Sequence, residues 1–224
     1  MKEIVSTKPT YEVSVGASFF NIIKERSSTS ITFEDIVTRL DVIRTLGITP
    51  TVIEQEIWAS GVMFDYINQT SGADIALTAV SLPSELLNAL SGSSQQGGFV
   101  FNRVNDTEKE FAFGYWGENR DGSLVFYWHP VCKLAPGEET KNTRQNDPPD
   151  PQKNYTIKVL PFGSGGEGAV WRIKYDQSIA KKEGLTPLTI EEFFLNPIYS
   201  ESQVPADQII TVTLDGKIVD TIDM

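Results

Sequence analysis

The chain has 224 residues, of which 40% are hydrophobic, and its 19 Lys and Arg against 30 Asp and Glu give a net charge of −11. This composition suits one domain, or one domain with an appended segment, and it excludes a chain that is disordered throughout. A surface that grips nucleic acid is disfavoured, because such surfaces neutralise phosphates with Lys and Arg. No apolar stretch reaches the roughly 18 residues of a membrane span, and the start lacks the apolar segment of a secretion signal. We therefore expect a soluble protein made in a cytoplasm.

The first third of the chain predicts extended structure with one ambiguous segment. Residues 11–15 alternate in polarity and indicate a short strand, and residues 52–64 are also predicted to be extended. Residues 31–46 carry apolar side chains at helical spacing but are rich in β-branched residues, which favour strands. The sequence leaves both helix and strand open for this segment.

A strand followed by a short helix is predicted next. Residues 75–80 alternate as a strand, and residues 82–90 carry a leucine stripe that is closed by Ser91 and Gly92. Pro83 is tolerated near the first helical position because its missing N–H would be unpaired there. We expect this helix to lie across a sheet and residues 99–104 to form another strand.

The strongest hairpin signal lies between residues 110 and 134. Asp121 and Gly122 separate two aromatic and β-branched runs, and such a pair supplies the positive φ of a two-residue hairpin turn. The run after this turn is apolar on both faces, so it must be covered on both sides, by its own domain alone or together with a neighbouring subunit.

A long polar segment, residues 135–153, follows this hairpin and predicts a protruding arm. Unstructured segments of this length are uncommon inside compact domains and are usually functional. Its charged residues suit an exposed polar contact, and its prolines limit the entropy lost on docking. The candidate interface residues are Glu138, Glu139, Lys141, Arg144, Asp147, Asp150 and Lys153.

Beyond this predicted arm, residues 155–159 and 171–175 alternate as strands, residues 191–195 form a possible short helix, and residues 209–222 repeat the hairpin signature around an Asp-Gly pair. Many short strands joined by turns predict a mainly β fold, a sandwich or barrel of two packed antiparallel sheets. We divide the chain into a domain over residues 1–175 and a C-terminal extension over residues 176–224.

No catalytic or metal-binding constellation is evident. His129 is the only histidine and has no triad partner in sequence, and Cys132 lies in an apolar strand where burial explains it. The glycine-rich run 163–168 lacks the lysine of a phosphate loop and leads into a strand. Carboxylates between residues 138 and 150 match no calcium-loop spacing. We expect neither an enzyme, nor a cofactor, nor a metal site.

The order of these elements resembles the major tail protein, or tail tube protein, of long-tailed bacteriophages (siphoviruses) that infect Gram-positive hosts. The resemblance covers roughly residues 31–175 and rests on order and pattern. It is carried by the strand and helix of residues 74–92, the run Phe111-Ala112-Phe113-Gly114-Tyr115, the Asp121-Gly122 turn, the strand 124–133, the polar arm and the strand 155–161.

The resemblance implies a tail-tube fold in which six subunits close a ring through a shared β-barrel and the rings stack into a tube. The segment 135–153 would reach the next ring. The tube would be part of the virion tail, assembled in the host cytoplasm, and an acidic lumen would keep double-stranded DNA from binding as it passes. Its partners would be copies of itself, a tape-measure protein, and tail-terminator and distal tail proteins, with no membrane.

Two alternative functions remain at this point. A tube protein of a contractile injection or secretion machine would share the fold and differ in its partners. A carbohydrate-binding β-sandwich would instead use exposed aromatic residues to stack on sugars. The aromatic candidates for such a platform are Tyr115, Trp116, Tyr127, Trp128 and Trp171.

Overall fold

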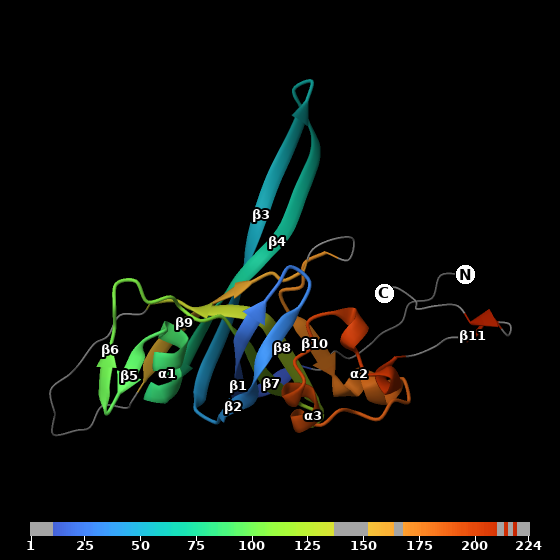
Figure 1. The fold of residues 1–224 in the computed structure, drawn as a ribbon. Helices are drawn as coiled ribbons and strands as arrows, with labels where there is room; N and C mark the ends of the chain where they lie inside the picture. The colour runs from blue at the N-terminus through green and yellow to red at the C-terminus, as the bar shows by residue number, and fades with distance from the viewer. Residues whose placement is uncertain (1–10, 137–151, 164–167, 210–212, 215–216, 219–224) are drawn as a thin grey trace.

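The structure is a computed structural model that describes residues 11–136, 152–163, 168–209, 213–214 and 217–218. The prediction of a mainly β fold with few helices is confirmed over these residues (Figure 1). The large sheet contains β1 (Glu12–Arg26), β2 (Ile31–Leu40), β3 (Ile43–Ala59), β4 (Val62–Ala79), β7 (Phe111–Asn119), β8 (Leu124–Leu134), β9 (Lys153–Leu160) and β10 (Ile173–Asp176). The two small sheets pair β5 (Ser94–Gln96) with β6 (Phe99–Phe101), and β11 (Thr213–Leu214) with β12 (Lys217–Ile218). The helices are α1 (Ser84–Ser91), α2 (Gln177–Lys182) and α3 (Ile190–Leu195), with 3-10 turns at Glu201–Gln203 and Ala206–Gln208.

The large sheet is antiparallel and folds over on itself. Its strand order is β2-β1-β7-β8-β9-β4-β3, and β10 pairs with the first half of β8. The main core lies between the two halves of this sheet, because its side chains come from β1, β7 and β8 on one side and from β4 and β9 on the other. The expected two layers are therefore hydrogen-bonded into one continuous sheet through β8 and β9, where Val131 pairs with Leu160.

The main core closes with α1, the predicted helix. Leu86 and Leu90 are buried on its inner face beside Ile75 and Phe113 of the sheet. Gly92 ends the helix in a left-handed conformation, with φ of 74°, and its N–H group donates to the carbonyl of Ala89. Helix α1 thus packs on the sheet as the leucine stripe predicted.

A second core lies on the other face of β1, β7 and β8, where the segment after residue 176 covers the sheet. Phe193 and Phe194 of α3 are buried there against Phe126 and Trp128 of β8. Both faces of β8 are therefore covered, as its two-sided apolar pattern predicts. The cover on this second face comes from the same chain, whereas the sequence also suggested a neighbouring subunit.

The structure corrects two expectations of detail. Residues 31–46 are extended, in β2 and the start of β3, so the helical alternative is wrong. The β7–β8 loop is not a two-residue turn, because Asn119 donates its N–H to the carbonyl of Ser123 and Gly122 donates to Asn119. Only Gly122 has positive φ in this loop, 78°, which is the left-handed residue of a three-residue hairpin loop.

Candidate interaction surface

The predicted arm residues lie almost entirely outside the described part of the chain. Glu138, Glu139, Lys141, Arg144, Asp147 and Asp150 are not described, whereas Lys153 is an exposed residue at the start of β9. The base of the segment is fixed, since Ala135 donates its N–H to the carbonyl of Thr156 at 2.8 Å. The interface role of these residues therefore stays a prediction.

A different arm is present in the described structure, formed by the outer parts of β3 and β4 (Figure 1). We call residues 52–71 the β3–β4 arm. On β4 it begins at Ser71, two residues from Ala73, whose pairing with Val159 is the last between β4 and β9. From there outward, β4 pairs only with β3. Ser71 Oγ donates to the carbonyl of Thr51 at 3.3 Å across this base.

A tight turn of two residues closes the arm. Ala59 pairs with Val62, and the two residues between them, Ser60 and Gly61, have φ of 53° and 77°. Positive φ at both central positions defines a type I′ turn, whose twist matches that of the flanking strands. The arm is therefore a regular β-hairpin, and its sequence signal was the Ser-Gly pair between two β-branched and aromatic runs.

The two faces of the arm differ in chemistry. Cross-strand pairs place Ile53 opposite Gln69, and Ile67 opposite Gln55, on a face of mainly aliphatic and amide side chains. Asp65 is the acidic residue of this face and pairs with Ile57. On the other face, Glu56 lies opposite Tyr66, and Trp58 follows on the same side. We call these the aliphatic face and the aromatic face of the arm.

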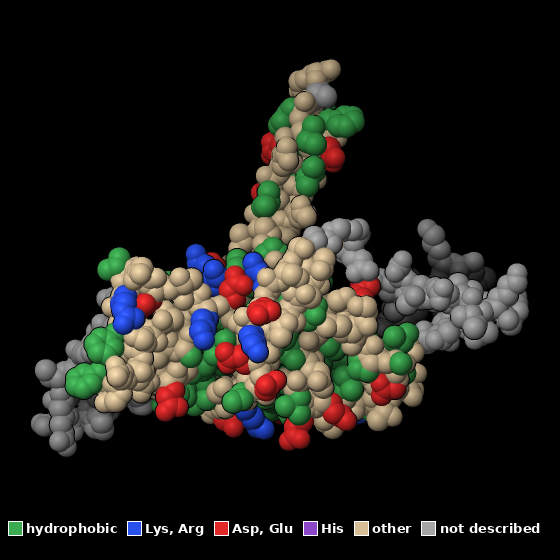
Figure 2. Space-filling model, in the orientation of Figure 1, with side chains coloured by type: hydrophobic (Ala, Val, Ile, Leu, Met, Phe, Trp, Pro, Cys, Tyr) green, Lys and Arg blue, Asp and Glu red, His purple; other side chains and the backbone are tan. Residues whose placement is uncertain are grey.

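The apolar side chains of the arm are exposed to solvent in the isolated chain. Trp58 is 60% exposed and Phe64, at the bulge next to it, is 77% exposed. Further exposed apolar residues of the arm are Val52, Ile53, Val62, Met63, Tyr66 and Ile67. Figure 2 shows these hydrophobic side chains along the projecting hairpin, away from the body of the molecule.

The charged residues of the arm are all acidic. Residues 52–71 contain Glu54, Glu56 and Asp65 and no Lys or Arg. Two carboxylates contact side chains of the aromatic face. Trp58 Nε1 donates a hydrogen bond to Glu56 Oε2 at 3.1 Å. Desolvation and a hydrogen bond to Glu54 together raise the pKa of Tyr66. The aromatic face therefore presents ring surfaces beside negative charge.

The body of the molecule offers a second kind of exposed surface, the outward face of β3, β4 and β9. Three cross-strand rows build it, and each row takes one residue from each strand. These rows are Thr45-Thr78-Asn154, Gly47-Ala76-Thr156 and Thr49-Asp74-Lys158. Small and hydroxyl side chains dominate this polar sheet face, and it carries one acidic and one basic residue.

The large sheet also has two outer strands. Within the described residues, β2 pairs only with β1 and β3 pairs only with β4. Each outer strand therefore presents a row of backbone donors and acceptors that another strand could use.

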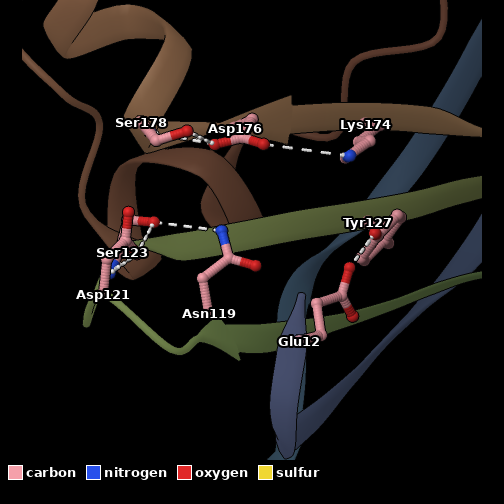
Figure 3. Close-up of polar contacts among 8 residues, drawn as sticks. All are labelled: Glu12, Asn119, Asp121, Ser123, Tyr127, Lys174, Asp176 and Ser178. Carbon is pink, nitrogen blue, oxygen red and sulfur yellow. Dashed lines mark hydrogen bonds and ion pairs between the residues drawn. The ribbon is translucent and has the colours of Figure 1, made fainter. Parts of the chain in front are cut away.

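The polar contacts near the ends of β7, β8 and β10 serve the fold (Figure 3). Asp121 Oδ1 accepts hydrogen bonds from the N–H and the hydroxyl of Ser123, which lowers the pKa of this carboxyl. Asp176 caps α2 in the same way through Ser178. Tyr127 donates to Glu12 between β8 and β1. These carboxylates lie at separate turns and contacts and do not converge on one point (Figure 3).

The single histidine and the single cysteine of the chain are buried. His129 is fully buried, and because a carbonyl oxygen only accepts, its Nδ1 donates to the oxygen of Trp171 at 3.0 Å. Burial lowers the pKa of His129 to about 4, so the ring is neutral at pH 7. Cys132 is buried, as predicted, and burial raises the pKa of its thiol. Among the described residues, no group of three or more His, Cys, Asp or Glu side chains is placed to hold a metal ion.

The proposed sugar platform is not available on the aromatic residues named for it. Tyr115, Tyr127 and Trp128 are buried in the two cores, and Trp116 and Trp171 are half-buried against them. Apart from Tyr11, just before β1, the exposed aromatic residues of the described chain lie on the β3–β4 arm and on β6.

Comparisons with protein families and with curated proteins identify no relative. No protein-family model matches the chain, and no curated protein is significantly similar to it. Over the described residues, no helix combines the length and the apolar character needed to cross a membrane.

Proposed function

We propose that the protein is a structural subunit that assembles with copies of itself into stacked rings, and that this assembly is the tail tube of a long-tailed bacteriophage. The observation that carries the proposal is the β3–β4 arm, whose apolar side chains are uncovered in the isolated chain. The sequence resemblance supplies the number of six subunits in each ring and the role of the tube as a passive conduit for double-stranded DNA.

The arm supports assembly because many of its apolar side chains are exposed to solvent. A two-stranded hairpin is marginally stable by itself, and exposed contiguous apolar side chains usually mark an interaction site. The arm has apolar side chains on both of its faces, including Ile53 on one and Trp58 on the other. Cover on both faces requires surfaces outside the described part of this chain, which a neighbouring subunit can supply.

The outer strands and the polar sheet face fit a ring. Strand β3 can pair with an outer strand of the next subunit, and closure of such a ring removes the exposed sheet edges. The outward face of β3, β4 and β9 would then line the channel with hydroxyl and amide groups that offer phosphates no basic patch. Since Asp74 is the only carboxylate in the three rows, an acidic lumen would depend on other residues.

Two related proposals follow from the resemblance. The channel would hold a tape-measure protein during assembly, and tail-terminator and distal tail proteins would cap the tube in the virion. The segment 135–153, with its charged residues, remains a proposed contact between rings in addition to the β3–β4 arm. A tube of a contractile injection machine would use the same surfaces and differ by requiring a surrounding sheath.

Electron microscopy of the concentrated purified protein tests the proposal. We expect negatively stained rings of uniform diameter and stacks of them with a stain-filled channel. A folded protein that stays monomeric at every concentration, with or without tail-initiating proteins, would contradict a tube function. Binding of glycans by such a monomer would favour the carbohydrate-binding alternative.

A further inference from the structure

A second exposed apolar surface lies on the small sheet of β5 and β6. Phe99 is 71% exposed, and its ring lies 6.5 Å from that of Phe101 on the same face of β6. Val100 and Val104 are also exposed. We call residues 93–105 the β5–β6 ribbon. The ribbon and the β3–β4 arm extend from different parts of the body and point in different directions (Figures 1 and 2).

One basic residue marks this ribbon. Arg103 is the only charged residue between positions 93 and 105. Its Nη1 donates to Ser94 Oγ at 3.0 Å, and Ser94 lies directly opposite Phe101 in the small sheet. The guanidinium is therefore held beside the exposed phenylalanine pair.

The arm and the ribbon are complementary in charge and in side-chain type. The aromatic face of the arm combines Trp58 and Tyr66 with acidic residues, and the ribbon combines exposed phenylalanines with Arg103. Aromatic residues and arginine are the residue types that are enriched in the centres of protein interfaces.

Charge also disfavours contact between two arms. Two arms packed against each other would bring together two copies of Glu54, Glu56 and Asp65, and the arm contains no basic residue to compensate them. Like charges placed together across an interface oppose association.

We propose that the aromatic face of the β3–β4 arm of one copy docks on the β5–β6 ribbon of the next copy, with Trp58 and Phe64 against Phe99 and Phe101. Glu54 or Glu56 of the arm then pairs with Arg103 of the neighbour. This inference rests on the proposed function and names the surface that receives the arm. Because the arm and the ribbon are different surfaces, the contact is heterologous and repeats from copy to copy, as a growing tube requires.

Two complementary variants test the contact. The arm variant carries Trp58→Ser and Phe64→Ser, and the ribbon variant carries Phe99→Ser and Phe101→Ser. All four side chains are exposed, so both variants should keep the circular dichroism and the unfolding midpoint of the unaltered chain. Ile179→Ser, at an exposed position of α2 outside both surfaces, is the matched control and should assemble normally.

Native mass spectrometry of the variants, alone and mixed, gives the readout. Each variant alone should stop at a monomer or a single ring at a concentration ten times higher than the unaltered chain needs to grow further. The mixture should form one new species, with one monomer or ring of each kind, because only one intact arm and one intact ribbon remain to meet. A mixture that behaves as the sum of its parts would overturn the docking.

Charge exchange provides an independent test. Arg103→Glu should weaken growth on the order of tenfold, and Arg103→Glu combined with Glu54→Lys and Glu56→Lys should restore it. Lys182→Glu, at an exposed basic position outside both surfaces, changes the net charge by the same amount and in the same direction as Arg103→Glu, and it should assemble normally.

The outcomes separate this inference from the proposed function. If the ribbon variant forms tubes as readily as the unaltered chain, the arm docks elsewhere and the tube function stands. If the unaltered chain never self-associates, both the docking and the tube function are wrong.

Discussion

The rings of Phe19 and Phe194 stack with centroids 3.9 Å apart and planes inclined by 7°. This contact joins β1, near the start of the chain, to α3, and both side chains are buried in the second core. This contact therefore holds the segment after residue 176 against a strand that lies far from it in the sequence.

Replacement of Phe194 by Ala should destabilise the folded subunit strongly. The change removes a buried ring that contacts Phe19, Phe126 and Trp128, and such substitutions cost about 3 to 5 kcal/mol. Urea unfolding followed by tryptophan fluorescence measures the free energy of unfolding. The control Leu195→Ala changes the next residue, which is 62% exposed, and should cost about 0.5 kcal/mol or less. Equal effects of the two changes would contradict the described packing of α3.

Gly114→Ala should also destabilise the subunit, through overpacking. A Cβ atom at this position of β7 would lie 2.2 Å from Cε3 of Trp128 and 2.6 Å from Cε1 of Phe194. Overpacking of this kind costs about 1 to 3 kcal/mol. Gly47→Ala on β3 is the matched control, since its added Cβ would meet no atom closer than 3.9 Å, and it should be neutral or slightly stabilising. Thermal unfolding measures the effect of both changes on stability. A Gly114→Ala protein as stable as the unaltered chain would be inconsistent with this core.

The burial of His129 predicts an acid-sensitive fold. The folded state holds its pKa at about 4, below its usual value of 6.5, so between these two values the unfolded state binds more protons. This contribution to stability is complete above about pH 6.5 and is lost as the pH falls toward 4, by up to roughly 3 kcal/mol. His129→Phe removes the titration and should flatten the pH dependence of the unfolding free energy in this window. An unchanged slope would show that other groups cause the acid sensitivity.

Much of the fold could be predicted from the sequence because local patterns and burial agree there. The leucine stripe of α1 and the two-sided apolar run of β8 each predicted the correct element and its burial. Residues 31–46 were ambiguous because helical spacing and β-branched residues conflict in this segment, and pairing of Ser18 with Leu40 resolves them as strand.

The β3–β4 arm was not predicted from the sequence. Residues 52–59 and 62–64 are extended as predicted, but the prediction missed the turn at Ser60 and Gly61 that divides them into β3 and β4. In addition, nothing local shows that both strands continue beyond their other neighbours in the sheet. That property depends on where β9 ends, at Leu160, which is about ninety residues away in sequence. The polar, proline-containing segment 135–153 looked more like an arm because long loops are conspicuous in a sequence and regular hairpins are not.

Sedimentation velocity of the full chain beside an arm-shortened variant tests whether the β3–β4 arm drives assembly. In the variant, a short Gly-Ser linker replaces residues 53–69 and joins Val52 to its cross-strand partner Thr70. The cores contain no residue of the replaced segment, so the variant should fold, with an unchanged thermal midpoint. We predict large, concentration-dependent assemblies for the full chain and no species beyond a monomer or a single ring for the variant. Identical sedimentation profiles, with long assemblies from both proteins, would contradict the role of the β3–β4 arm in assembly.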